Sequence, residues 1–351
     1  MKKIITILLA AITILLSCNT PDEPIDENFS NEISSDRMLL ILSAPSIHET
    51  YYSSAFQLIV DLQINYAKAI MDNDNVVVIV DKETKPYYEG KLREDILITD
   101  NVYDIWVRDF TTVNPLNPVQ FKYTWASMTE QESIEVQNSF NDFANQYEIE
   151  RATTNFLLDG GNLVDNYSGK VITTTRFMED NNLTYEEAKQ ELQNLLGATE
   201  VAIIEPDEEV LAHSDGMVSW IDENVLLIND YSDYPFFRNM VMNELKSAFP
   251  TSTIIEVPVQ YTTNPPGEWD GFESACGVNI NSTVTFNNIY VPTFGMSHDQ
   301  QVIDIIKQNT SKNVIEINAE GVCSMGGSVR CLTWQLTGLN AEKLILAARE
   351  N

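Results

Sequence analysis

The apolar residues of this chain recur with two different spacings, and segments of the two kinds alternate along the sequence. Spacings of three and four predict amphipathic helices, and short apolar runs rich in Val and Ile predict strands. The predicted helices cover about 49–71, 130–147, 184–196, 235–249 and 299–308, and strand-like runs include 38–42, 76–80, 170–174 and 225–228. Thr184 is a good N-cap because Glu187 follows three residues later, and Pro235 suits a first helical turn.

This alternation indicates an α/β fold built from similar units. Each predicted helix is separated from the next by two or three strand-like runs, so the chain contains five units without sequence identity between them. The pattern favours a pseudo-symmetric ring of ββαβ modules in which each helix covers its own sheet. An ordinary mixed α/β sandwich fits the same periodicity, and the pattern leaves both open.

The N-terminal segment predicts export. Residues 1–3 are Met-Lys-Lys, and the apolar run over 4–16 is too short to span a membrane as a mature helix. The sequence Leu-Leu-Ser before Cys18 resembles a lipobox, the processing site of bacterial lipoproteins. We therefore predict a signal peptide over residues 1–17, with cleavage at another site as the alternative. Lipidation of Cys18 would anchor the protein to a membrane without spanning it.

Residues 18–36 follow as a predicted tether. They are rich in Asp and Glu, contain two prolines and have little apolar content, which is typical of a flexible segment. An acidic stretch behind a lipidated cysteine resembles the surface-export tethers of some Gram-negative lipoproteins. The expected location is thus the outer membrane or the cell surface. No linker-like composition occurs later, so we predict one domain over residues 37–351.

The net charge of −31 narrows the choice of partners. Nucleic-acid binding needs basic patches, so it is excluded as a function class. A negative field attracts cationic ligands, although it also keeps an exposed protein soluble. The sequence does not indicate an oligomeric state.

The cysteines give a first indication of chemistry. With Cys18 lipidated, Cys276, Cys323 and Cys331 remain, and an odd number leaves one unpaired if the other two bond. A Cys276–Cys323 disulfide would leave Cys331 free, but the sequence does not fix the connectivity. No Cys-x-x-Cys or His-rich spacing indicates a metal site.

Carboxylates stand at the ends of three apolar runs. Asp109 follows the run 105–107, and Asp159 precedes a Gly pair that allows close backbone approach. In a third segment, His213 and Asp215 would project to the same side of an extended strand. Each residue alone is more typical of a structural role.

Cys331 lies after the pair Gly326-Gly327, inside a strand-like stretch, where a buried or disulfide-bonded thiol is the plain alternative. Together with the histidine and the three carboxylates, this thiol fits nucleophilic attack on a guanidinium group. Carboxylates hold a planar cation through paired N–H bonds, a thiolate is the nucleophile, and a histidine transfers protons.

At these residues the chain resembles the agmatine deiminase and bacterial (Porphyromonas-type) peptidylarginine deiminase family of the guanidino-group-modifying superfamily. Four family motifs occur in the family's order, and the likeness extends from about Met38 onward. They read Trp106-Val107-Arg108-Asp109, Asp159-Gly160-Gly161-Asn162, His213-Ser214-Asp215 and Gly326-Gly327…Cys331.

The resemblance implies a five-bladed α/β-propeller, the pentein fold. It implies Cys331 as nucleophile, His213 as acid and base, and Asp109 and Asp215 as the carboxylates that grip the guanidinium. Asp159 would be the family's third carboxylate, near His213. The resemblance further implies a substrate-binding set, in which Asn281 is ambiguous with its neighbour Asn279. This set is Trp106, Arg108, Asn162, Asn281 and Gly327.

The implied reaction is hydrolytic deimination of agmatine, arginine or peptidylarginine. A covalent thiouronium on Cys331 would release ammonia and then a ureido product, without a cofactor or metal. Two departures leave the substrate open: Arg330 stands where many relatives carry His, and residues 121–125 lack both the arginine pair of the peptidylarginine enzymes and the Trp-Gly-Gly pattern of the agmatine enzymes. The alternatives are non-catalytic binding of guanidino ligands and amidino transfer to an amine.

Overall fold

The computed structural model describes residues 31–124, 129–264, 269 and 272–350. The signal peptide predicted for residues 1–17, the lipidation site Cys18 and the tether up to residue 30 lie outside the described residues. Asn31, which the sequence analysis assigned to the tether, instead packs against the domain. Its side-chain amide donates to the carbonyl of Val76 at 2.8 Å and accepts from the N–H of Val76 at 2.9 Å. Within the described part of the chain, no helix combines the length and apolarity needed to cross a membrane.

Five small sheets share one strand order. In each three-stranded sheet the first two strands are antiparallel and the last two are parallel, and a helical segment connects the parallel pair. The strands are β1 (Leu39–Ser43), β2 (Asn75–Val80), β3 (Leu97–Thr99), β4 (Thr112–Val113), β5 (Val119–Lys122), β6 (Ala152–Leu157), β7 (Val164–Asp165), β8 (Lys170–Thr174), β9 (Glu200–Ile204), β10 (Val218–Asp222), β11 (Val225–Asn229), β12 (Thr253–Val257), β13 (Thr283–Val284), β14 (Asn288–Thr293), β15 (Asn313–Asn318) and β16 (Trp334–Leu336). The repeated ββαβ units predicted from the sequence are therefore present.

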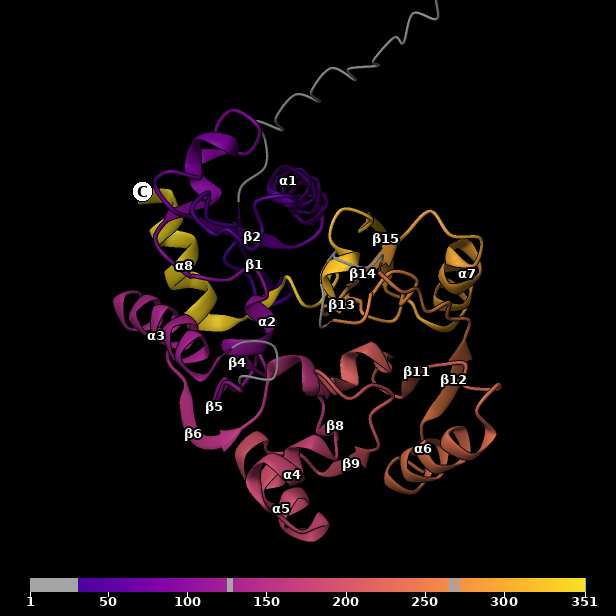
Figure 1. Ribbon diagram of the computed structural model, residues 1–351. Helices are drawn as coiled ribbons and strands as arrows, with labels where there is room; N and C mark the ends of the chain where they lie inside the picture. Colours follow the sequence, from indigo (N-terminus) through magenta and orange to yellow (C-terminus); the bar gives the residue numbers. More distant parts are fainter. Residues whose placement is uncertain (1–30, 125–128, 265–268, 270–271, 351) are drawn as a thin grey trace, which may run out of the picture.

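The remaining sheet contains strands from both ends of the described chain. Its order is β16-β1-β2-β3, with β16 antiparallel to β1 and β1 parallel to β2. The β16-β1-β2 part thus repeats the pattern of the other sheets, although β16 lies far from β1 in the sequence. In Figure 1 the five sheets follow one another around a common centre, and the helices lie on the outside.

The helices largely follow the predicted periodicity. They are α1 (Phe56–Met71), α2 (Val107–Phe110), α3 (Glu130–Gln146), α4 (Arg176–Asn181), α5 (Tyr185–Leu196), α6 (Pro235–Ala248), α7 (Asp299–Asn309) and α8 (Gly338–Glu350). The predicted N-cap is confirmed, since Thr184 and Glu187 form a capping box at α5. The first helix begins later than the predicted residue 49, and α2, α4 and α8 were not predicted.

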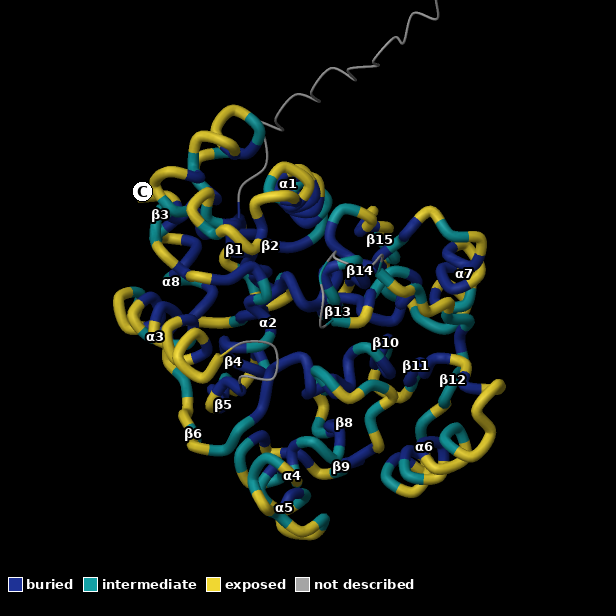
Figure 2. Tube along the Cα trace, in the orientation of Figure 1, coloured by how far each residue is buried: buried dark blue, intermediate teal, exposed yellow. Residues whose placement is uncertain are grey.

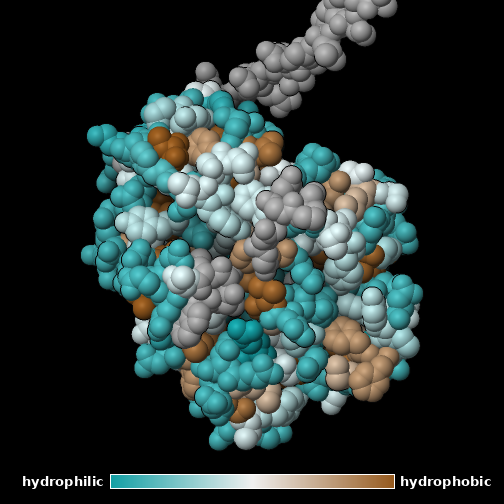
Figure 3. Space-filling view, in the orientation of Figure 1, coloured by the Kyte–Doolittle hydropathy of each residue, from teal (hydrophilic) through white to brown (hydrophobic). Residues whose placement is uncertain are grey.

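The apolar core is divided among the junctions between neighbouring units. One cluster, for example, joins Ile172 and Ala202 of one sheet to Leu226 and Val241 of the next unit. Figure 2 shows buried residues along the inner strands and exposed residues along the outer helices. Figure 3 shows a largely hydrophilic face with apolar atoms gathered over α6, where Phe236 is 84% exposed. Between its helices and strands the chain turns near the centre of the molecule, and the motif segments lie in these turns.

Candidate active site

The motif segments lie in turns, where the sequence analysis expected strands. Asp109 is in α2, Asp215 is in a 3-10 turn over Ser214–Gly216, and Cys331 is in a turn before β16. The prediction that His213 and Asp215 lie on one side of an extended strand is therefore wrong about the strand, because the chain makes a helical turn after His213. The two side chains nevertheless line the same cavity.

The backbone around His213 is held by side chains from other segments. Ala212, just before it, has a φ of 56°, in the left-handed region, which costs about 1–2 kcal/mol for a residue with a Cβ. The hydroxyl of Thr174 donates to the carbonyl of Ala212 at 2.7 Å. Asn162 Oδ1 accepts the N–H that follows His213 at 3.2 Å, and the Glu208 carboxylate accepts the N–H of Ala212. These bonds fix the direction in which the imidazole points.

His213 lies between two carboxylates. Its Nε2 is 3.3 Å from Asp159 Oδ2, and its Nδ1 is 3.9 Å from Asp109 Oδ1. Asp159 is anchored by Thr124, whose N–H and hydroxyl donate to it at 2.9 and 2.8 Å. Asp109 Oδ1 accepts the N–H of Gly161 at 2.9 Å. The imidazole is thus oriented from both of its nitrogens.

This arrangement favours the protonated imidazole. Burial opposes protonation of His213, but the charge of Asp109 together with the hydrogen bond and charge of Asp159 outweighs burial and raises its pKa to about 10. Burial also raises the pKa of Asp109 to about 7, against the opposing charge of His213. A cationic histidine beside a nucleophile is suited to donate a proton to a leaving group.

The glycines of the motifs allow close contacts that a larger residue would prevent. A Cβ on Gly161 would lie 2.5 Å from His213 Nδ1 and 2.7 Å from Asp109 Oδ1. A Cβ on Gly327 would lie 2.5 Å from the ring of Trp106. A residue with a Cβ at either position would therefore clash with these side chains, so the close packing requires glycine.

Cys331 is a free thiol, 8% exposed, at the bottom of the site. Its Sγ is 3.4 Å from Asn281 Oδ1, which also accepts the hydroxyl of Ser328 at 2.9 Å. Burial raises the pKa of the thiol well above its usual value; the charges of Asp215 and Asp109 add to this effect, and nearby Arg330 opposes it. These surroundings therefore favour the thiol form.

A disulfide joins Cys276 to Cys323. This is the pairing that the sequence left open, and it leaves Cys331 unpaired. Cys323 also accepts, through its carbonyl, the N–H of Ala275 at 2.8 Å, so the bridge joins two segments that border the site. The thiol chemistry of the site therefore rests on Cys331.

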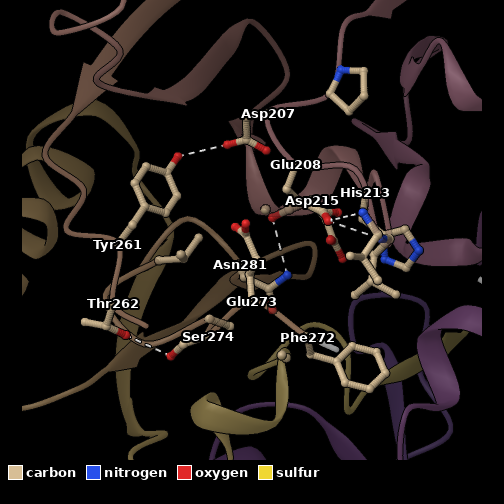
Figure 4. Close-up of a pocket in the computed structure, with 18 of the residues that line it drawn as sticks. Asp207, Glu208, His213, Asp215, Tyr261, Thr262, Phe272, Glu273, Ser274 and Asn281 are labelled. Atoms are coloured by element: carbon tan, nitrogen blue, oxygen red, sulfur yellow. Dashed lines mark hydrogen bonds between the residues drawn. The ribbon is translucent and has the colours of Figure 1, made fainter. Parts of the chain in front are cut away.

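Two cavities, of about 770 and 520 Å³, meet at His213 and Cys331. The first is bordered by Asp215 and Asn281, which Figure 4 shows converging with His213. The second is bordered by Asp109 and Trp106, among other residues. A group placed over the thiol would thus be exposed to one carboxylate from each cavity.

The structure brings seven of the ten predicted site residues to these cavities. They are Cys331, His213, Asp109, Asp215, Trp106, Asn281 and Gly327. Asp159 lies behind His213 and contacts it. The substrate contact predicted for Arg108 and Asn162 does not fit, because both side chains are bonded to protein groups away from the two cavities. Arg108 donates to Gln335 at 2.7 Å, and Asn162 accepts backbone N–H groups.

The sequence analysis missed Asp104. This carboxylate borders the second cavity and accepts the hydroxyl of Tyr52 at 2.7 Å and the N–H of Trp106 at 3.2 Å. Burial raises its pKa. Its position two residues before the first motif was the available signal. Over the described ranges, no cluster of His, Cys, Asp or Glu side chains is arranged to hold a metal ion.

The comparisons with known proteins agree on one fold. The model of the family described as Porphyromonas-type peptidyl-arginine deiminase matches residues 30–336. C. jejuni agmatine deiminase superposes with a TM-score of 0.73 and 18% identity, covering 88% of this chain and 96% of that one. Enterococcus faecalis agmatine deiminase superposes with a TM-score of 0.69 and 16% identity, covering 88% of this chain and 95% of that one. DDAH from Pseudomonas aeruginosa, solved with citrulline, superposes with a TM-score of 0.50 and 11% identity, covering 85% of this chain and 98% of that one. No curated protein matches the sequence significantly.

Proposed function

The chain belongs to the Porphyromonas-type peptidyl-arginine deiminase family, and we propose that it hydrolyses the guanidino group of a cationic substrate to a ureido group and ammonia. The observation that carries this proposal is the convergence of free Cys331, His213 between two carboxylates that raise its pKa, and the carboxylates of Asp109 and Asp215. We propose with it that the five sheets form the five-bladed pentein propeller. Their circular order in Figure 1 supports this arrangement.

The substrate guanidinium would lie over Cys331, between Asp109 and Asp215. Carboxylates accept N–H bonds of a planar cation at well-defined angles, and each of these two borders one cavity. The bound cation would offset the two negative charges that help to raise the pKa of the thiol. The thiolate would therefore form when the substrate is present.

The reaction then proceeds in two steps. The Cys331 thiolate attacks the guanidinium carbon, a C–S bond forms, and the His213 imidazolium donates its proton to the departing nitrogen as the C–N bond breaks and ammonia leaves. Water attacks the resulting thiouronium and gives a proton to the now neutral His213. The C–S bond breaks and the remaining proton of the added water passes to solvent, which releases the neutral ureido product and restores the thiolate. Asp159 keeps the imidazole oriented throughout.

The charges around the site bear on the substrate. Asp207, Glu208 and Glu273 border the first cavity, and Asp104 and Glu49 are among the acids of the second. Among the described residues that border either cavity there is no Lys or Arg, and His213 is already paired with Asp109 and Asp159, so a substrate carboxylate would find no free cationic partner among them. We therefore propose that agmatine-like compounds and internal arginines of peptides are better substrates than free arginine or C-terminal arginine.

The test is a colorimetric assay of ureido product over agmatine, free arginine, and internal and C-terminal arginyl peptides. The wild type should give product, and Cys331→Ser should lose at least about 10³-fold in rate. Mass spectrometry of quenched wild type should show an adduct on Cys331. Ammonia release by Cys331→Ser at the wild-type rate would refute the proposal. Thermal stabilisation by agmatine without product or adduct would favour simple binding, and product formed only with an added amine would favour amidino transfer.

We also propose that the protein is an exported lipoprotein anchored through Cys18, on the outer membrane or the cell surface. The support is the basic N-terminus, the apolar run over residues 4–16 and the lipobox-like sequence before Cys18. Cys18→Ala should move the protein from the membrane fraction to the soluble fraction. Equal membrane association of the two forms would contradict lipidation at Cys18.

A further inference from the structure

Arg330, directly before the nucleophile, places a buried guanidinium group behind the site. Its Nη1 donates to Asp215 Oδ2 at 2.7 Å, and its Nη2 donates to the carbonyl of Leu163 at 2.7 Å. Its backbone N–H donates to Asn281 Oδ1 at 3.2 Å. The side chain is 11% exposed, and Arg330 borders neither of the two cavities. It therefore contacts Asp215 from outside the two cavities.

These bonds connect segments that are distant in the sequence. Arg330 is in the Cys331 turn, Asp215 is in the His213 turn, and Leu163 immediately follows the segment that holds Asp159. One side chain thus joins two of the four motif segments to the residue that follows a third. A guanidinium is suited to this because its planar fork donates in two fixed directions at once, whereas an ammonium cannot match that geometry.

The contact also limits how Asp215 can bind a ligand. Oδ2 is taken by Arg330, and the hydrogen bonds of the described residues leave Oδ1 for the substrate. A carboxylate with one free oxygen holds a guanidinium well only if that oxygen is accurately placed. Asp215 is 2% exposed, so its position depends on its protein contacts rather than on water.

We propose that Arg330 is a positioning residue for deimination: it fixes Asp215 with one oxygen facing the substrate and keeps a positive charge next to the Cys331 turn. The inference rests on the proposed function for its catalytic part. Its electrostatic part concerns the free protein, where the charge of Arg330 lowers the pKa of the Cys331 thiol against burial. The two parts are therefore testable separately.

The first experiment measures alkylation of Cys331 by iodoacetamide as a function of pH, which requires no turnover. Arg330→Gln removes the charge and should move the titration of the thiol to higher pH. Arg330→Lys keeps the charge and should leave the profile close to that of the wild type. Arg176→Gln, which breaks a partly exposed ion pair with Asp180, is the control and should change nothing. Identical profiles for Arg330→Gln and wild type would overturn the electrostatic part.

The second experiment is a double-mutant cycle on kcat/KM for the best substrate. Arg330→Gln should lose about 10²-fold, and Arg330→Lys should show a KM raised about tenfold because Lys cannot reach both acceptors. If Arg330 acts through Asp215, the double variant Arg330→Gln/Asp215→Asn should be no worse than Asp215→Asn alone. Additive losses would overturn the positioning role.

Protein stability separates a positioning role from a merely structural one. Arg330→Gln leaves a buried carboxylate unpaired, so its Tm should fall, whereas the double variant removes both charges and should recover part of that fall. Losses of activity that track Tm across all variants, with no change in KM or in the alkylation profile, would show a structural role only. If the wild type turns over no guanidine, the proposed function fails, but the alkylation experiment still decides the electrostatic part.

Discussion

Replacing Gly161 with alanine tests whether the position of His213 governs the reaction. The added methyl would lie 2.5 Å from His213 Nδ1 and 2.7 Å from Asp109 Oδ1, where ordinary contact begins at 3.4 Å. The imidazole must therefore move by about 0.9 Å and the carboxylate by about 0.7 Å if the backbone stays in place. Neither side chain is free to swing away, because Asp159 holds the other nitrogen of the buried ring and the N–H of Gly161 itself holds the partly buried Asp109 carboxylate.

We expect this displacement to lower kcat/KM by about 10²-fold, the usual effect of moving a catalytic group by about 1 Å. Overpacking should lower the free energy of unfolding by about 1–3 kcal/mol, which leaves the protein folded at room temperature. Alkylation of Cys331 should remain possible, since the methyl group points at the histidine and not at the thiol turn. The expected phenotype is a folded protein with a reactive thiol and slow turnover.

The assay is the ureido measurement at saturating and low substrate, with unfolding followed by circular dichroism. Gly216→Ala is the matched control. Gly216 lies in the His213 turn and has an ordinary backbone conformation, and no heavy atom lies within 4 Å of the added Cβ. The kcat/KM of Gly216→Ala should stay within about threefold of that of the wild type. The reasoning fails if Gly161→Ala has wild-type kcat/KM, or if both alanine variants lose activity equally.

Two further predictions concern stability. The pKa of His213 is raised from 6.5 to about 10, so its protonation stabilises the fold fully below about pH 6.5 and this contribution disappears as the pH rises through 10. Urea unfolding of wild type and His213→Gln should therefore differ most near pH 6 and converge near pH 10; a pH-independent difference would contradict this. Replacing Cys276 and Cys323 by Ser opens a loop with a sequence separation of 47, which should cost about 4 kcal/mol of unfolding free energy. A loss of unfolding free energy below about 1 kcal/mol would show that other contacts keep the two ends of this loop together in the variant.

The repeating units could be predicted from sequence because each helix and strand is selected by local periodicity. An amphipathic helix such as α5 shows its buried face at spacings of three and four, and its start at Thr184 is encoded by a capping box within four residues. The sheets follow, since each ββαβ unit pairs strands that are close in sequence. The strands of the β16-β1 pair are the exception, because nothing local connects them.

The site was predictable in its residues but not in its conformation. The turn after His213 depends on Asn162, whose side chain bonds a backbone N–H 52 residues away, and no local pattern encodes such a bond. Likewise Arg330 was visible as a departure from the family, but its partner Asp215 lies 115 residues away. Arg108 was assigned to the substrate by its motif, whereas packing turned its guanidinium to Gln335.

The pairing of β16 with β1 also determines when the protein becomes reactive during its synthesis. Cys331 lies just before β16, and its carbonyl accepts the N–H of Arg108, so the nucleophile reaches its place only when the last strand pairs with the first. Contacts so distant in sequence form late, because the entropy of closing the intervening loop must be overcome first. A chain still emerging from the ribosome therefore carries its histidine and carboxylates without their thiol. The order in which the segments assemble therefore keeps the incompletely folded chain from reacting.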